Sequence, residues 1–312
     1  MRIYRQAKSL QRQHQGAVIA VGNFDGVHQG HRTVIAEAGR IAASASLPWG
    51  VLTLEPHPRK VFQPAAQPFR LTPFRAKAEQ IAALGVDFLI AQKFDLDFSK
   101  QTAADFVETY LVGTLNVHHV VAGYDFKFGH KRQGSCETLL SEGQKLGFGF
   151  TVVAAASDDG GGLYSSSRTR ELIEAGDMPA AAALLGRPFS ICGRVSGGDK
   201  RGRSIGFPTA NLLLGDYIRP AFGVYAVRAT LPGGDVVDGV ANLGMRPTFD
   251  GTAPRLEVHL FDFDADIYDR RIDVALLEMI RPEKKFDGLD ALKAQIARDC
   301  VCARDILKKS EA

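Results

Sequence analysis

The sequence lacks long apolar runs and paired cysteine motifs. No stretch of its 312 residues approaches the roughly 18 apolar residues of a membrane helix, and the apolar run at 17–21 is far shorter than a signal-peptide core. We therefore expect no membrane segment and no membrane partner. The 4 cysteines show no CxxC pairing, which argues against a zinc site and predicts reduced thiols in a cytoplasmic protein.

Concentrated charge is also absent. The 38 Lys and Arg residues against 35 Asp and Glu give a net charge of +3, and they form no basic run. This distribution argues against a nucleic-acid partner and favours phosphorylated small molecules. The sequence has no internal repeat or low-complexity tract, and 312 residues with 45% hydrophobic content are typical of two globular domains. The sequence does not determine whether the chain associates with further copies of itself.

The first half alternates short β-like runs with helical patterns. The β-like runs lie at 17–21, 49–54, 88–91, 118–122 and 150–155, with helical spacing at 33–43, 74–84, 103–111 and 136–145. Strands alternating with helices predict a parallel α/β sheet with ligands at the carboxyl ends of its strands. Residues 167–176 and 179–185 are expected to form the last helices of this half.

The pattern changes after about residue 186, where Gly186-Arg187-Pro188 interrupts the helical spacing. Short β-like runs follow at 191–195, 207–214, 223–231, 235–243, 255–263 and 272–280. Strands without intervening helices predict a small closed β-barrel. One helix is expected at 289–306, with its apolar side formed by Leu289, Leu292, Ile296 and Val301. The predicted domains are 1–186 and 187–312.

A glycine-rich turn follows the first long β-like run, and it consists of Gly22, Asn23, Phe24, Asp25 and Gly26. His28 and His31 come next, at the expected start of a helix. Such a helix N-terminus offers N–H groups and a positive dipole end, and histidines three apart can reach one phosphate together. The turn lacks GxxxxGK[ST], which excludes a Walker-type loop. From the residues alone, surface histidines or half of a metal site remain alternatives.

These residues resemble a known family. GNFDGVHxGH is similar to the adenylyltransferase module of bacterial bifunctional FAD synthetases, and HxGH is the mark of the HxGH nucleotidyltransferases, which have a Rossmann-like α/β fold. Segments 53–58 (TLEPHP), 121–129 (VAGYDFKFG) and 165–170 (SSSRTR) resemble the same module. The last is similar to ISSTxxR and departs from it at Tyr164, Ser167 and Thr169.

The resemblance implies that the FMN phosphate attacks the α-phosphorus of ATP while His28, His31 and Arg170 orient the reactants and stabilise charge. It further implies ATP or phosphate contacts for Gly22, Asn23, Phe24, Asp25, Gly26, Ser165, Ser166 and Arg168, and flavin contacts for His57 and Asp125. From the residues alone, Asp125 is also typical of a turn or cap, and Arg170 of an exposed helix.

The β-rich half opens with a segment of glycines and bases at 193–203, which can close over a phosphate. Thr209 and Asn211 follow at a predicted strand start, where residues two apart share one face. Their hydroxyl and amide oxygens could take two positions around Mg²⁺, with ATP phosphates and water completing the shell. From the residues alone, PTAN is more typical of a turn followed by a strand, and Glu257 is more typical of a surface carboxylate.

GRxxGFPTANL resembles the riboflavin kinase module of the same family, as do residues 242–249 and 256–261. The resemblance implies that Glu257 is the general base for the riboflavin 5′-hydroxyl and that Thr209 and Asn211 hold Mg²⁺. It implies phosphate contacts for Gly197, Lys200, Gly202 and Arg203, and flavin contacts for Phe207 and Arg281.

Together the resemblances predict a bifunctional FAD synthetase that uses ATP and Mg²⁺, with riboflavin, FMN and FAD as substrates and products. A flavin or nucleotide carrier without turnover is one alternative. A second is an HxGH transferase for another phosphorylated substrate, with the barrel only binding. A third is a kinase-only member, because the departures at Tyr164, Ser167 and Thr169 all lie in the adenylyltransferase half. Product identity separates these alternatives.

Overall fold

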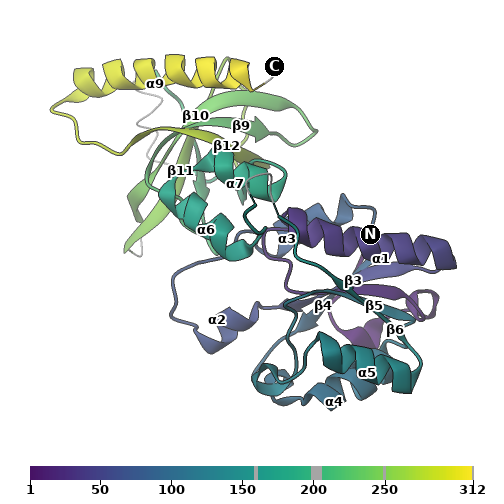
Figure 1. Cartoon of the computed structure of the whole chain (residues 1–312). Helices are drawn as coiled ribbons and strands as arrows, with labels where there is room; N and C mark the ends of the chain where they lie inside the picture. The colour runs from purple at the N-terminus through teal and green to yellow at the C-terminus, as the bar shows by residue number, and fades with distance from the viewer. Residues whose placement is uncertain (158–160, 198–205, 249–250, 311–312) are drawn as a thin grey trace. The chain divides into compact units, whose positions relative to one another are not determined.

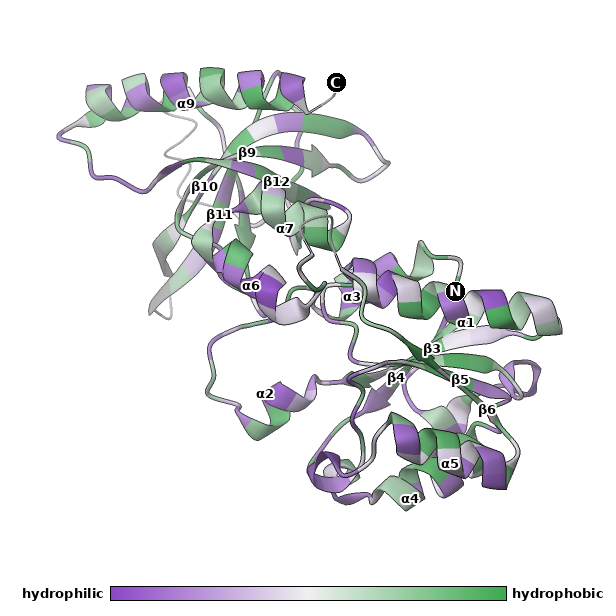
Figure 2. Cartoon of the chain, viewed as in Figure 1, coloured by the Kyte–Doolittle hydropathy of each residue, from purple (hydrophilic) through white to green (hydrophobic). Residues whose placement is uncertain are grey.

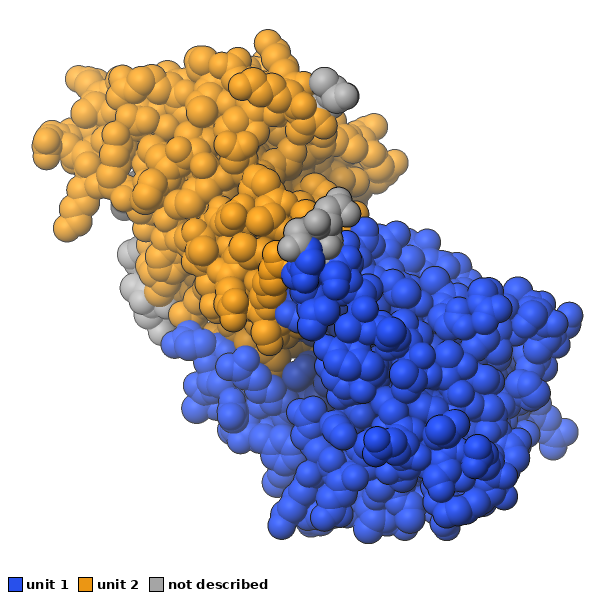
Figure 3. All heavy atoms as spheres, viewed as in Figure 1, with its two compact units in different colours: residues 1–67, 72–165 blue, residues 68–71, 166–312 orange. Residues whose placement is uncertain are grey.

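The computed structural model describes residues 1–157, 161–197, 206–248 and 251–310 (Figure 1). The contacts within the chain divide it into two compact units (Figure 3). The first unit contains residues 1–67 and 72–165, and the second contains residues 68–71 and 166–312. No helix in the described part of the chain is both long and apolar enough to cross a bilayer.

The first unit contains a parallel sheet with the strand order β1-β4-β3-β2-β5-β6. Its strands are β1 (Arg2–Tyr4), β2 (Val18–Val21), β3 (Trp49–Glu55), β4 (Phe88–Lys93), β5 (His119–Gly123) and β6 (Gly149–Val153). Without β1, this is the order of a doubly wound α/β fold, and it reverses at β2, between β3 and β5. The predicted parallel sheet is confirmed; the three-residue β1 was missed because its signal is so short.

Helices cover both faces of this sheet (Figure 1). They are α1 (Gln29–Ala45), α3 (Phe74–Ala82), α4 (Ala103–Asp105), the π-helix η4 (Phe106–Thr114) and α5 (Cys136–Leu146). The short helix α2 (Pro58–Phe62) lies in the loop after β3 and has no buried residue. Single 3₁₀ turns occur at η1 (Ala7–Ser9), η2 (Arg12–His14), η3 (Phe98–Lys100) and η5 (His130–Arg132). The helix expected at 103–111 is therefore mostly a π-helix.

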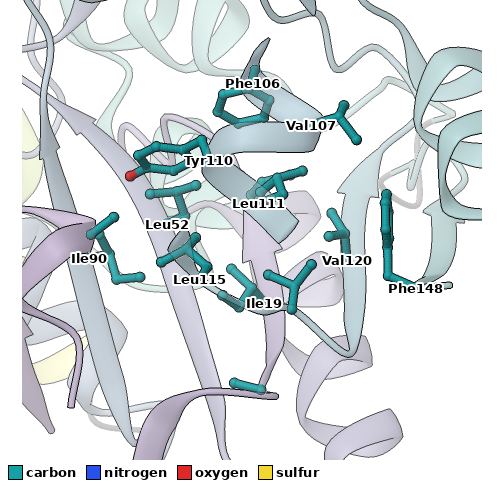
Figure 4. Close-up of a cluster of buried hydrophobic side chains, with 14 of the residues drawn as sticks. Ile19, Leu52, Ile90, Phe106, Val107, Tyr110, Leu111, Leu115, Val120 and Phe148 are labelled. Atoms are coloured by element: carbon teal, nitrogen blue, oxygen red, sulfur yellow. The ribbon is translucent and has the colours of Figure 1, made fainter. Parts of the chain in front are cut away.

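The central strand β2 is apolar on both faces because both are covered. Val18 and Ala20 pack with α1 and α3, and Ile19 and Val21 belong to the cluster on the opposite face. Figure 4 shows that opposite cluster, in which Ile19 lies among side chains from neighbouring strands and from η4. A continuous apolar run is thus what a central parallel strand requires.

The second unit contains an antiparallel sheet with the order β7-β12-β9-β10-β11-β8. Its strands are β7 (Phe189–Arg194), β8 (Ala210–Leu213), β9 (Gly223–Thr230), β10 (Val236–Thr248), β11 (Gly251–Leu260) and β12 (Arg271–Pro282). Ser196, just after β7, forms a bridge with Asn211 in β8, with its N–H 2.9 Å from the Asn211 carbonyl. The bridge brings the outer strands together, and the predicted small barrel is confirmed.

Helices α6 (Ser166–Ala175) and α7 (Met178–Leu185) also pack in the second unit. The carbonyl of Ile173 accepts from Ala221 N at 3.3 Å, and a Cβ added at Gly176 would lie 2.7 Å from Met279 Sδ. The contacts therefore divide the chain between Ser165 and Ser166. The domain boundary at residue 186 stays a prediction.

The predicted terminal helix is α9 (Leu289–Lys309), along which hydrophilic and hydrophobic residues alternate (Figure 2). Ala303 and Leu307 are buried against β9 and β10. The predicted apolar side was partly wrong, because Leu289 and Val301 are exposed. Val301 is two residues from the buried Ala303, which at 3.6 residues per turn places it about 160° away, on the opposite side of the helix.

Candidate active sites

The first candidate site is the turn between β2 and α1, at the edge where the strand order reverses. Its backbone has positive φ angles at Phe24 (48°), Gly26 (94°) and Val27 (43°). A β-branched residue such as Val27 rarely adopts this conformation, which costs on the order of 1–3 kcal/mol. Such strain persists only where the surroundings enforce it, and it is typical of binding sites.

Phe24 supports the turn with a buried side chain. A Cβ added at Gly22 would lie 2.9 Å from Phe24 Cζ, so residue 22 must be glycine for this ring to pack there. The ring also meets His31 edge to face, with a centroid distance of 5.3 Å. The predicted glycine and phenylalanine thus form one packed unit with the second histidine.

The structure brings the two predicted histidines together. The rings of His28 and His31 are stacked, with centroids 3.6 Å apart, and His28 is only 4% exposed. His28 is the N-cap of α1, because its Nδ1 accepts from His31 N at 3.3 Å. In the neutral ring this leaves the proton on Nε2, which is then a hydrogen-bond donor.

Gly30 lies between the histidines and Tyr164. A Cβ added at Gly30 would lie 3.3 Å from His28 Cε1 and 3.2 Å from Tyr164 Cβ, so glycine permits this close approach. Tyr164 is one of the departures from the ISSTxxR pattern. It contacts the HxGH segment, and Ser165 follows it directly in the same unit.

Thr72 and Lys77, which the sequence analysis missed, form hydrogen bonds with the turn. Asp25 Oδ1 accepts from Thr72 N at 3.1 Å, and Gly26 N donates to Thr72 Oγ1 at 2.8 Å. Lys77 Nζ donates to the Asn23 carbonyl at 3.0 Å. The partners of Thr72 and Lys77 lie about 50 residues away in the sequence. The only signal in the sequence is therefore that each is a polar residue at an inward-facing position, near or within α3.

His57 and Asp125 lie at the same edge of the sheet, after β3 and β5. His57 caps α2, with Nδ1 accepting from Arg59 N at 3.1 Å, and Asp125 is exposed.

Burial raises the pKa of the nearby Cys136 thiol, so this cysteine is poorly suited as a nucleophile. None of the four cysteines, all within the described residues, forms a disulfide.

The remaining SSSRTR residues, from Ser166 on, begin α6 in the second unit. Arg168 is partly exposed. Arg170 Nε donates to the Phe69 carbonyl at 2.8 Å, and its guanidinium lies 5.6 Å from the Phe69 ring centre. The phosphate contacts of Ser165, Ser166, Arg168 and Arg170 stay predictions from the motif.

The second candidate site is a cavity of about 980 Å³ in the β-rich unit, at the upper end of the range for small-molecule sites. Five of its lining residues occupy paired positions on five neighbouring strands. The row consists of Asn211 (β8), Glu257 (β11), Asn242 (β10), Val224 (β9) and Arg281 (β12). Directly paired residues face the same side of a sheet, so this row crosses the cavity wall.

Phe207, Thr209 and Asn211 all line the cavity, and their predicted flavin and Mg²⁺ contacts stay predictions. Asn211 is 4% exposed, and its Nδ2 donates to the Thr209 carbonyl at 3.5 Å. His259 Nδ1 is bonded to the Pro208 carbonyl at 2.9 Å, and its ring meets Phe207 edge to face. The loop before β8 is therefore fixed to β11, next to Glu257.

Arg281 reaches the cavity wall but is already engaged by α9. Its Nε and Nη2 donate to the Asp299 carboxylate at 3.0 and 2.7 Å. Asp299 is 3% exposed and also accepts from Gln295 Nε2 at 2.8 Å. The flavin contact of Arg281 stays a prediction. The sequence analysis missed Asp299, a lone carboxylate on the buried face of a helix, and Asn242, which opens a motif segment.

Part of the predicted phosphate loop can be placed. Gly197 is exposed, and a Cβ added there would meet no heavy atom within 4 Å. Lys200, Gly202 and Arg203 lie outside the described residues.

Comparisons with known proteins match both halves. The FAD synthetase family model matches residues 10–168, and the riboflavin kinase family model matches residues 185–307. The chain is 42% identical over 291 residues to the bifunctional riboflavin kinase/FMN adenylyltransferase of Escherichia coli K12, covering 93% of each chain. It is 41% identical over 288 residues to the protein of that name from Bacillus subtilis, covering 91% of this chain and 90% of the relative.

A solved structure shares the fold over almost the whole length. It is a Streptococcus pneumoniae protein described as a macrolide-efflux protein, with a TM-score of 0.83 and 32% identity. The match covers 95% of this chain and 96% of that one.

Proposed function

The chain belongs to the family of bifunctional riboflavin kinase/FMN adenylyltransferases, and from that premise we propose which residues perform each of its two reactions. The C-terminal half phosphorylates riboflavin to FMN with ATP, and the N-terminal half adenylylates FMN to FAD with release of pyrophosphate. The observation that carries this assignment is the ordered match of both family models, together with relatives of that name over nearly the full chain.

For the kinase, Glu257 is the proposed general base. It lies in the cavity row directly opposite Asn211, beside the loop that contains Thr209. A base must lie within hydrogen-bond reach of the hydroxyl it deprotonates. Glu257 accepts the proton of the riboflavin 5′-hydroxyl as that oxygen forms a bond to the γ-phosphorus of ATP. The bond from this phosphorus to the β,γ-bridging oxygen breaks, and ADP leaves.

Thr209 and Asn211 are the proposed Mg²⁺ ligands. Both offer neutral oxygen atoms, the type of donor that suits Mg²⁺, and both line the cavity. No group of three or more His, Cys, Asp or Glu side chains suited to a metal occurs in the described part of the chain. This fits an ion that takes most of its ligands from ATP phosphates and water. When bound, Mg²⁺ neutralises charge on the phosphoryl group.

For adenylyl transfer, the proposed site is the turn between β2 and α1. The FMN phosphate attacks the α-phosphorus of ATP and pyrophosphate leaves, so no protein nucleophile is needed. The imidazole of His28, which caps α1, and the positive dipole end of that helix face the developing charge on phosphate oxygens. His31, stacked on His28, adds a second imidazole, and Arg170 is assigned to phosphate on the motif alone.

His57, Asp125, Phe207 and Arg281 are proposed flavin contacts on the strength of their motifs. The disulfide-free cysteines support the proposal of a cytoplasmic enzyme. Its proposed ligands are small molecules, without a nucleic-acid or membrane partner.

The direct test is to incubate the purified chain with riboflavin, ATP and Mg²⁺ and to separate the fluorescent flavins over time. FMN should appear first and then be replaced by FAD. FMN alone would remove adenylyl transfer from the proposal. Unchanged riboflavin would favour a carrier or a transferase for another substrate.

A further inference from the structure

Helix α3 carries a buried lysine on its inner face. Lys77 is 0% exposed and lies beside the core residues Ala78 and Ile81. Removing an ammonium group from water is costly, and replacing a buried ion pair by apolar side chains is often neutral or stabilising. Stability alone is therefore a weak reason for a cation at this position, and its contacts are more informative.

Lys77 Nζ, an ammonium group with N–H donors only, contacts three oxygen atoms of the turn and of β3. They are the Asn23 carbonyl at 3.0 Å, Thr53 Oγ1 at 3.0 Å and Glu55 Oε2 at 3.2 Å. Thr53 Oγ1 in turn donates to the same Asn23 carbonyl at 3.0 Å. We call this group, formed by Lys77, Thr53 and Glu55, the carbonyl clamp.

The carbonyl clamp fixes the orientation of one peptide plane in the turn. In a trans peptide, C=O and N–H point in opposite directions. With the Asn23 carbonyl held toward Lys77, the N–H of Phe24 points away from it. Phe24 is also the first residue of the turn with a positive φ angle. The clamp thus acts at the point where the strained backbone begins.

A second anchor lies two residues further on, where Thr72 binds both Asp25 and the N–H of Gly26. Thr72 and Lys77 flank the first turn of α3. Groups of the protein itself therefore hold the turn in its strained form at two points. Donors fixed in advance lower the reorganisation needed when charge develops on a phosphate.

We propose that Lys77 is a positioning residue for adenylyl transfer, acting through the Asn23 carbonyl on the phosphate-binding turn without touching substrate. This proposal rests on the function assigned to that turn above. It predicts a defect in how ATP is bound and oriented, with the flavin phosphorylation carried out by the barrel unaffected.

The test is the variant Lys77→Met, which keeps a side chain of similar length and removes the charge and the donors. FAD formation from supplied FMN is measured at varied ATP and at varied FMN, with riboflavin kinase activity measured on the same preparation. We expect kcat for FAD formation to fall about ten- to hundredfold, the scale of a lost charge-assisted hydrogen bond. KM for ATP should rise, while KM for FMN and the kinase rate stay at parental values.

Arg75→Met is the matched control, because Arg75 is a cation on the same helix with an exposed ion pair to Glu79 at 2.9 Å. It should retain parental kinetics. Thr53→Val removes the other donor to the Asn23 carbonyl without a buried charge, and it decides the question if Lys77→Met does not fold. In Thr53→Val we expect kcat for FAD formation to fall less than in Lys77→Met, with KM for ATP again raised and KM for FMN and the kinase rate unchanged.

A merely structural role predicts a different outcome, namely fewer folded molecules with both KM values unchanged. That result in both variants, or parental kcat and KM for ATP in both, would overturn the proposal. If the parent chain itself makes no FAD from FMN, the function assigned to the turn fails instead, so the two failures are distinguishable.

Discussion

The turn after β2 and the cavity of the barrel unit build their sites in different ways. In the first, the groups come from residues 22–31, a continuous segment with positive φ angles and a buried histidine cap. In the second, Asn211, Glu257 and Arg281 come from three strands and meet only through the pairing of the sheet. The first site uses backbone and a helix N-terminus, and the second uses individual side chains.

This contrast predicts how each site fails. The turn should depend on residues that never touch substrate, because they hold its backbone in a costly form. The barrel site should lose activity when the single carboxylate Glu257 is replaced, since this group performs one defined chemical step. The two activities should also be separable by substitution, because the proposed groups are not shared.

The largest expected effect is that of Glu257→Gln on the kinase. The amide cannot accept the proton of the riboflavin hydroxyl, and a general base contributes about 10²- to 10⁴-fold in rate. FMN formation should fall by that factor, while conversion of supplied FMN to FAD continues. Glu278→Gln, an exposed carboxylate of β12 outside the cavity lining, is the control. Equal loss of both activities in Glu257→Gln would contradict separate sites.

Replacement of His28 and His31 by Ala should have the reverse effect. Removing one fixed donor to a developing charge costs about 10²- to 10³-fold, so FAD formation should fall at least that far and FMN should accumulate from riboflavin. His118→Ala, an exposed histidine of the same unit, should leave both activities intact. FAD synthesis at the parental rate in the double variant would remove these histidines from the mechanism.

Much of this contrast follows from what a sequence can reveal. The turn was predicted because its chemistry lies within ten consecutive residues next to a strand. The row across the cavity depends on strand register, which shifts at Leu276/Glu278 and again at Met279/Arg281 in β12. Asn242 was missed because its place in the row comes from its pairing with Glu257 and Val224 on neighbouring strands, which no local pattern reveals. Lys77 was missed because its carbonyl partner lies 54 residues away.

A smaller effect should follow Asp299→Asn, which removes one charge of the buried pair with Arg281. Breaking such a pair costs about 3–5 kcal/mol, so the melting temperature of the barrel unit should fall. Riboflavin KM should rise if Arg281 contacts flavin, and FMN-to-FAD conversion should not change. Asp305→Asn, on the exposed side of α9, is the control and should leave the melting temperature of the barrel unit unchanged. Unchanged melting in Asp299→Asn would show that the pair contributes no stability.

The smallest expected effect is a pH dependence of the first unit. Burial, and secondarily Arg2, lowers the pKa of His14 below its ordinary 6.5, with Asp87 opposing the shift. The folded state therefore prefers neutral His14, so this stability is present above pH 6.5 and is lost as the pH falls through the lowered value.

In the folded first unit His14 is bonded to the Tyr4 hydroxyl at 2.7 Å. His14→Gln removes the titration and keeps a polar side chain. The melting temperature of the first unit should drop less in this variant than in the parent between about pH 8 and about pH 5. Equal drops would assign the acid sensitivity to other groups.

Mixing the two inactive variants tests the division of labour most directly. Neither Glu257→Gln nor the His28→Ala, His31→Ala double variant should convert riboflavin to FAD alone in the presence of ATP and Mg²⁺. A mixture of the two proteins should restore FAD formation, because FMN made by the second is a substrate for the first. Absence of FAD from the mixture, with each protein folded, would contradict two independent sites in one chain.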